Sequence, residues 1–218
     1  MKIMLILLFT QFIMSLNADE NIKIIKELSK TIYYLNNKEY TTNKEKLDNF
    51  VKSINLNDSN ILKELHKIKN EFLITSVYFK NTKGTLIALN LSAEINFQYK
   101  ISPLSISIIN NDFKTTKILI DYGININRID ETKYPSIFWA IYLNNEKIFN
   151  FLKDKGADLS FTLKNGKTPI QAAIEIENIV LIELLLKKNA YIKDEYKKEM
   201  KNLKNKNIKN ILKNYKII

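Results

Sequence analysis

Residues 102–127 read SPLSISIINNDFKTTKILIDYGININ, residues 135–160 read PSIFWAIYLNNEKIFNFLKDKGADLS, and residues 168–193 read TPIQAAIEIENIVLIELLLKKNAYIK. These three stretches align without a gap, and their turns fall at positions 123, 156 and 189, a period of 33 residues. A fixed period of this length is typical of a chain built from repeated supersecondary units. Within each unit, apolar residues recur at helical spacing on both sides of a short polar turn, which predicts a pair of helices.

The residues at the predicted helix ends are those that helix ends prefer. The Ser-Pro and Thr-Pro pairs at 102–103 and 168–169 can cap a helix and start it with proline, whose missing N–H costs nothing at that position. Gly123 and Gly156 are predicted to follow the second helices in the left-handed conformation, and Asn189 occupies the same place in the third unit.

Small side chains recur inside the first helix of each unit, at Ser107, Ala140 and Ala173. They allow this helix to lie close to its neighbours. A single helix pair cannot bury its apolar face alone, so the units must stack. With only 4 glycines and 3 prolines among 218 residues, we predict an all-α solenoid of stacked helix-turn-helix units with helical caps at both ends.

This pattern resembles the ankyrin repeat, whose hallmark is Thr-Pro-Leu-His-x-Ala with a period of 33 residues. The closest matches are residues 102–104 with Ser107, residues 168–170 with Ala173, and the turn at 155–158. The histidine of the hallmark is replaced by Ser105, Phe138 and Gln171. Because that histidine ties neighbouring turns together in the family, we expect looser connections between the repeats of this chain.

The resemblance divides the chain into segments. A degenerate unit, whose following loop is two residues shorter, is predicted at 71–96, and clear units at 97–129, 130–162 and 163–193. The flanks are predicted to form a helical N-terminal cap at 19–70 and basic capping helices at 194–218. Within the N-terminal cap, apolar sets predict helices around 22–35 and 47–54, and a third helix that begins with Asp58 or Ser59 as its cap.

The first eighteen residues have the pattern of a secretory signal peptide. Met1 and Lys2 precede an apolar stretch at 3–16, and Ala18 is the small residue at the expected cleavage point before Asp19. An uncleaved anchor and a buried N-terminal helix are the alternatives, although this stretch of about 14 residues is shorter than the roughly 20 that a membrane-spanning helix needs. Cleavage would give a bacterial protein that is periplasmic or secreted.

Composition excludes several classes of function. The absence of cysteine and the single histidine, His66, exclude disulfides, a thiol nucleophile and a multi-histidine metal site, so no cofactor is expected. The sequence has no Gly-rich phosphate loop, no Gly-x-Ser-x-Gly and no His-Glu-x-x-His, and we predict that it is not an enzyme. The net charge of +11 partly reflects codon bias toward lysine, and the single arginine, Arg128, argues against nucleic-acid binding.

The resemblance implies that a protein partner binds a concave face made of loop tips and first helices. Carried over position by position, the partner-contacting residues are Tyr99, Ile109, Tyr122, Glu131, Tyr134, Tyr142, Leu143, Lys164, Lys167 and Ile176. The same carry-over gives further variable surface positions at Gln98, Ile101, Asn110, Thr132, Lys155, Asn165, Glu175 and Lys188. Tyrosine gives large contact area at low entropic cost, so the four tyrosines predict a contact patch, with packing between units as the alternative. Trp139 is predicted to serve packing. We expect a monomer whose partner the sequence does not identify.

The C-terminal segment is the most basic part of the chain. Residues 193–218 carry nine lysines and three acidic residues, and their apolar residues recur at helical spacing. We predict a solvated pair of capping helices. The alternative is an envelope-associated protein that this segment holds to an anionic surface such as a membrane. A secreted effector that acts on a host cell shares the same fold and is a third hypothesis.

Overall fold

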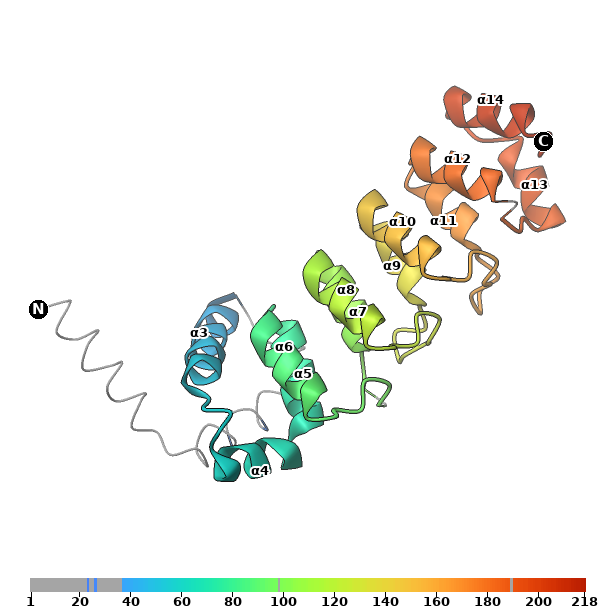
Figure 1. The fold of residues 1–218 in the computed structure, drawn as a ribbon. Helices are drawn as coiled ribbons and strands as arrows, with labels where there is room; N and C mark the ends of the chain where they lie inside the picture. The colour runs from blue at the N-terminus through green and yellow to red at the C-terminus, as the bar shows by residue number, and fades with distance from the viewer. Residues whose placement is uncertain (1–22, 24–25, 27–36, 98, 189) are drawn as a thin grey trace, which may run out of the picture. The chain divides into compact units, whose positions relative to one another are not determined.

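The computed structural model describes residues 23, 26, 37–97, 99–188 and 190–218. Over these residues the chain forms twelve helices, α3 to α14, and no strand (Figure 1). It divides into two compact units, Met1–Ile124 and Asn125–Ile218, called unit 1 and unit 2 below. The predicted signal peptide, the predicted helix around 22–35 apart from residues 23 and 26, and the predicted turn residue Asn189 lie outside the described residues.

Unit 1 contains two stacked helix pairs and two further helices before them. The helices are α3 (Asn37–Ser53), α4 (Ser59–Lys67), α5 (Lys69–Tyr78), α6 (Thr82–Asn90), α7 (Pro103–Ile109) and α8 (Phe113–Asp121). Helix α5 packs against α6 and α7 against α8, while α5 also contacts α7 and α6 contacts α8. The apolar set predicted around 47–54 is buried on α3, where the ring of Phe50 lies 6.1 Å from that of Phe72 on α5.

Unit 2 repeats this arrangement. Its helices are α9 (Ser136–Tyr142), α10 (Glu146–Asp154), α11 (Pro169–Glu175), α12 (Ile179–Lys187), α13 (Asp194–Met200) and α14 (Lys206–Asn214). Helices α9 and α10 form one pair, α11 and α12 form the next, and α9 packs against α11. The predicted basic segment forms α13 and α14, which bury Met200, Ile208 and Leu212.

The helix caps follow the sequence closely. The Ser102 hydroxyl accepts the Ser105 N–H at 3.0 Å, and α7 then begins with proline as predicted. Of the two candidate caps before α4, Asp58 takes the role, since its carboxylate accepts backbone N–H groups at 2.9 and 3.3 Å. Gly123 and Gly156 follow the second helices with φ of 84° and 92°, the left-handed conformation that their lack of a side chain allows.

A second set of caps was not predicted. Each second helix begins after an Asn or Asp whose side chain accepts the N–H three residues later, at 2.7 to 3.1 Å; these caps are Asn81, Asp112, Asn145 and Asn178. The residue before each cap has φ between 53° and 56°. This positive φ turns the chain from the first helix into the second. The spacing of 31, 33 and 33 residues between these caps was the available signal.

Small side chains bring paired helices together, as predicted. Ser107, Ala140 and Ala173 are fully buried, and the Ser107 hydroxyl lies 2.9 Å from that of Thr116 on the facing helix. In the degenerate unit, helices α5 and α6 also lie close together. A Cβ on Gly84 of α6 would lie only 2.5 Å from the hydroxyl oxygen of Ser76 on α5. Glycine at position 84 therefore allows the two helices to approach.

Asparagines tie neighbouring turns where the hallmark histidine is missing. The Asn127 side chain donates to the Gly156 carbonyl at 3.2 Å and accepts the Asp158 N–H at 2.8 Å. Asn96 donates to the Gly123 carbonyl at 3.3 Å. These bonds join neighbouring turns without the hallmark histidine, and looser connections between the repeats stay a prediction. Gln171, which replaces the histidine in α11, accepts the Thr168 backbone N–H at 2.7 Å and so caps its own helix.

Candidate functional site

The predicted contact residues of unit 1 are partly used by the unit itself. Tyr122 is 45% exposed, and its hydroxyl donates to the Asn90 side chain at 2.9 Å. Tyr99 is half-buried, and its hydroxyl donates to the Asn70 carbonyl at 3.2 Å. Ile109, the last residue of α7, is 38% exposed. Tyr122 therefore links the end of α8 to the end of α6, and Tyr99 links the segment before α7 to α5, while part of each tyrosine stays at the surface.

In unit 2 the structure brings Tyr134 and Tyr142 together. Tyr134 lies just before α9 and Tyr142 ends it, and their ring centroids are 5.9 Å apart in an edge-to-face contact. Tyr134 also packs against Trp139 at 5.6 Å, and Tyr142 packs against Phe138 at 6.3 Å. Both tyrosines and Trp139 are half-buried. The rings thus combine the two roles that the sequence left open, because they pack within the unit and also present an aromatic edge.

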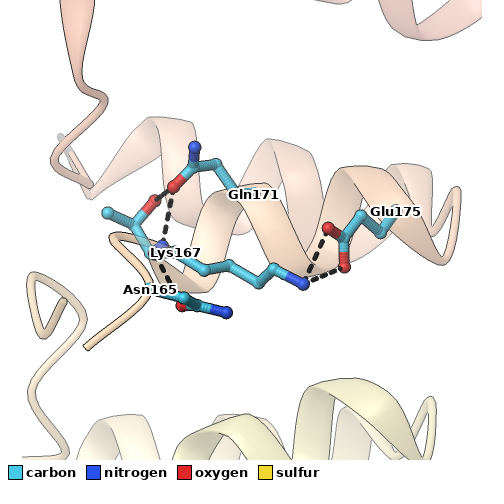
Figure 2. A network of polar contacts seen from close by, with 5 residues as sticks. Asn165, Lys167, Gln171 and Glu175 are labelled. Carbon is cyan, nitrogen blue, oxygen red and sulfur yellow. Dashed lines mark hydrogen bonds and ion pairs between the residues drawn. The ribbon is translucent and has the colours of Figure 1, made fainter. Parts of the chain in front are cut away.

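The same two positions of the next repeat carry an ion pair. Lys167 and Glu175 stand 33 residues after Tyr134 and Tyr142. The Lys167 side chain runs along α11 to Glu175, as Figure 2 shows, and its ammonium lies 2.8 Å from the carboxylate. The same ammonium is 5.9 Å from the centroid of the Tyr142 ring, which is within reach of a cation–π contact. A charged pair of one repeat therefore borders the aromatic pair of the preceding one.

A tight turn positions Lys167. Asn165 accepts the backbone N–H of Lys167 at 3.1 Å, a bond visible in Figure 2, and Gly166 has φ of 85°. Leu163 closes the turn, because its N–H donates to the Lys167 carbonyl at 2.9 Å and its carbonyl accepts the Gly166 N–H at 2.8 Å. The turn fixes the backbone from which the lysine side chain extends, and Glu175 holds the ammonium. The Lys167 side chain is therefore held at both of its ends.

Electrostatics at this cluster follow from these contacts. The hydrogen bond that the Lys167 ammonium donates to the Glu175 carboxylate raises the pKa of Lys167 above its usual value, so the lysine is charged. Burial raises the pKa of the Tyr142 hydroxyl, and the neighbouring lysine partly opposes this shift. Burial also raises the pKa of Tyr196 on α13, with further contributions from Glu175 and Glu199. The tyrosines are therefore neutral donors at physiological pH.

A polar hollow of about 300 Å³ opens beside the ion pair. Residues of the 165–167 turn, of α11 and of α13 with its N-cap line it: Asn165, Gly166, Lys167, Gln171, Glu175, Lys193, Glu195, Tyr196 and Glu199. Asn165, Lys167 and Glu175 were predicted surface positions, whereas Tyr196 was predicted only as part of the C-terminal capping helices. The 33-residue period does not extend to α13, so no repeat register pointed to Tyr196.

The remaining predicted contact residues of unit 2 are neighbours of these cluster residues in the sequence. Leu143, the C-cap that follows α9, is 45% exposed, while the corresponding C-cap after α11, Ile176, is half-buried. Glu131 and Lys164 are exposed on the loops before α9 and α11. The face of unit 2 that combines Tyr134, Tyr142, Lys167, Glu175 and the hollow is called the tyrosine–lysine face below.

The described residues hold no group of three or more acidic or histidine side chains placed to bind a metal ion. His66 is exposed on α4. Among the helices that the structure describes, none has the length and apolar character needed to cross a membrane.

Comparison with known proteins identifies the repeats. The model of the family described as ankyrin repeats, which spans three copies, matches residues 15–162. The chain belongs to the ankyrin repeat family. One relative comes from Borreliella burgdorferi (strain ATCC 35210 / DSM 4680 / CIP 102532 / B31) and is named as an ankyrin repeat protein. It is 62% identical to this chain over 214 residues, which are 97% of this chain and 98% of the relative.

Two viral proteins that are also named for ankyrin repeats share shorter stretches. One from Acanthamoeba polyphaga mimivirus is 38% identical over 68 residues, 31% of this chain and 9% of the viral protein. One from Fowlpox virus (strain NVSL) is 31% identical over 97 residues, 44% of this chain and 23% of the viral protein. The predicted fold class, an all-α ankyrin-repeat solenoid, is confirmed by the family match and the all-helical structure.

The family also sets the general role of the chain. Ankyrin repeats are interaction modules that typically mediate protein–protein contacts and carry no catalytic site. The ankyrin repeats of this chain therefore indicate a protein–protein interaction scaffold.

Proposed function

We propose that this chain is an exported, non-catalytic scaffold that binds a protein partner through the tyrosine–lysine face of unit 2. The observation that carries the proposal is the placement of a tyrosine pair beside an ion pair at matching positions of two consecutive repeats. Tyrosine rings supply contact area with little loss of rotamer entropy, and charged groups at the rim supply specificity. The hollow beside them adds polar groups for a side chain of the partner.

Export rests on the signal-peptide pattern at 1–18 and on an expected periplasmic or secreted location. The bacterial relative, which matches this chain over nearly its whole length, is in keeping with a bacterial origin. In this proposal the mature chain acts as a monomer, because one ankyrin stack can present its binding face without a second copy. A secreted effector directed at a host protein would use the same face.

A pair of photo-crosslinking variants tests the proposal. Lys164, exposed on the loop before α11, is a predicted contact residue, whereas Lys187 is equally a lysine and exposed but lies in the last turn of α12. Each is replaced in turn by p-benzoylphenylalanine, and crosslinked proteins of the native cell envelope are identified by mass spectrometry. We expect one partner to be captured reproducibly at position 164 and not at position 187.

The captured partner then provides a binding assay. We expect Tyr134→Ala with Tyr142→Ala to abolish its binding, while the helical circular dichroism signal stays close to that of the unmodified chain. The more conservative Glu175→Gln, which breaks the ion pair and keeps the shape, should weaken binding without unfolding. Equal capture at positions 164 and 187, or full binding by the tyrosine variant, would reject the tyrosine–lysine face.

A further inference from the structure

Positive charge is unevenly distributed within unit 2. Residues 125–192 carry nine basic and eight acidic side chains, whereas residues 193–218 carry nine and three. Every charged side chain in residues 200–218, called the lysine segment below, is a lysine: Lys201, Lys204, Lys206, Lys209, Lys213 and Lys216. A codon bias toward lysine acts on the whole chain alike, so it does not account for the missing acidic residues here.

The lysine segment is a folded part of unit 2. Met200, Ile208 and Leu212 are 0%, 1% and 0% exposed, so the apolar side of α14 is already used for packing. Five of the six lysines are exposed and Lys209 is half-buried. The segment thus presents lysines on a packed helix. Its buried apolar residues are not available for insertion into a bilayer.

Helix stability explains only part of this arrangement. Lys213 and Lys216 lie at the C-terminal end of α14, and Lys201 is the C-cap of α13, positions where the helix dipole favours positive charge. Lys204 and Lys206 flank Asn205, the N-cap of α14, where the dipole disfavours it. Lysines at a position that costs stability indicate a role outside the fold, because local rules are mostly broken at functional sites.

We propose that the lysine segment binds anionic lipid headgroups at a membrane surface, without insertion. Lysines are compact point charges that suit a fluid anionic surface, whereas base and phosphate reading in nucleic acids relies on arginine, which the segment lacks. Tyr215, 36% exposed as the C-cap of α14, adds an amphipathic ring of the kind found at headgroup depth. This inference does not depend on the tyrosine–lysine face, since the residues differ.

Charge variants test the binding of lipid headgroups better than truncation does, because truncation would remove Met200, Ile208 and Leu212 from the core. The test variant replaces four exposed lysines of the segment by glutamine: Lys201, Lys204, Lys206 and Lys213. The matched control makes the same change at four exposed lysines of unit 1: Lys46, Lys52, Lys63 and Lys114. Both variants of the full chain lose the same net charge. The test variant relieves charge beside the N-cap of α14 and loses Lys201 and Lys213 from helix C-termini, while the control loses Lys52 from the last turn of α3, so the two variants should melt at similar temperatures.

Partitioning onto vesicles is measured by sedimentation, with phosphatidylcholine alone and with about 30% phosphatidylglycerol, at low and high salt. Each lysine at an anionic surface strengthens partitioning about fivefold, so the test variant should lose several hundredfold on anionic vesicles while the control loses about tenfold or less. The difference between the two variants should vanish at about 0.5 M NaCl, where charges are screened. The apolar stretch at 3–16 is common to all the proteins and cancels in this difference.

Three outcomes would overturn the inference. Equal losses by the two variants would show that net charge, and not this segment, drives binding. A difference that persists at high salt would show that insertion contributes. Tighter binding of the unmodified chain to duplex DNA than to anionic vesicles, lost in the test variant, would assign the lysine segment to nucleic acid.

Discussion

Replacing Gly84 by alanine should destabilise unit 1, because α5 and α6 touch at this point. The new Cβ would lie 2.5 Å from the hydroxyl oxygen of Ser76 and 3.2 Å from its Cβ. It would also lie 3.2 Å from the Asn81 side-chain oxygen that caps α6. The Ser76 side chain is fully buried within α5, so it cannot swing away into solvent.

The size of the effect follows from two opposing contributions. Overpacking a close contact costs about 1–3 kcal/mol, while alanine in place of glycine inside a helix gains about 1 kcal/mol. We therefore expect Gly84→Ala to lower the free energy of unfolding by about 1 kcal/mol. Ser76→Ala removes the oxygen that clashes, and this oxygen is buried without a hydrogen-bond partner in the described residues. Ser76→Ala alone should be neutral or slightly stabilising.

The double variant makes the prediction specific. Once Ser76 is alanine, Gly84→Ala should become neutral or stabilising, so the two substitutions are coupled by at least about 1 kcal/mol. Urea denaturation followed by far-ultraviolet circular dichroism, on all four proteins of the cycle, measures this coupling. Gly84→Ala that stabilises the chain while Ser76 is present, or that has the same effect in both backgrounds, would refute the close helix contact.

Asn127→Ala should lower the free energy of unfolding by about 1–2 kcal/mol in the same urea assay, because it removes the two hydrogen bonds that tie neighbouring turns. Asn202→Ala, at a position that is also exposed but outside these turns, should cost almost nothing. Equal effects would show that the turns are not tied this way. Burial raises the pKa of Tyr142, so the native state keeps this proton at a pH where the unfolded chain has lost it. Its share of stability is therefore complete below about pH 10 and is lost as the pH rises through the raised value. Thermal melts from about pH 9 to 11 should show a smaller loss for Tyr142→Phe than for the unmodified chain; identical slopes would contradict the shift.

The two proposed surfaces use unit 2 in different ways. The tyrosine–lysine face combines rings and a neutralised ion pair, which suits the surface of a protein. The lysine segment has six lysines and no acidic residue, which suits an extended anionic surface. Each surface has its own variants and its own readout, so that either can fail without the other.

The periodicity of the sequence predicts most of the fold. The 33-residue interval, the proline starts and the glycines after the second helices are local features, and local features decide where a helix begins and ends. The Asn and Asp caps of the second helices also recur at intervals of 31 and 33 residues, so the sequence contains the signal for them. The bonds between turns could not be read from the absent histidine, because asparagine also offers both a donor and an acceptor.

The sequence by itself therefore determined the repeat, the helix pairs and the positions at which surface side chains fall, because these depend on neighbours a few residues apart. Tertiary structure alone decided that Tyr142, Lys167 and Glu175 meet, that Tyr196 of α13 joins the same hollow, and that Gly84 lies against Ser76. These contacts join residues of different helices and loops. They form only where two packed helices come close enough to each other. The spacing of residues along the sequence does not specify the distance between two helices.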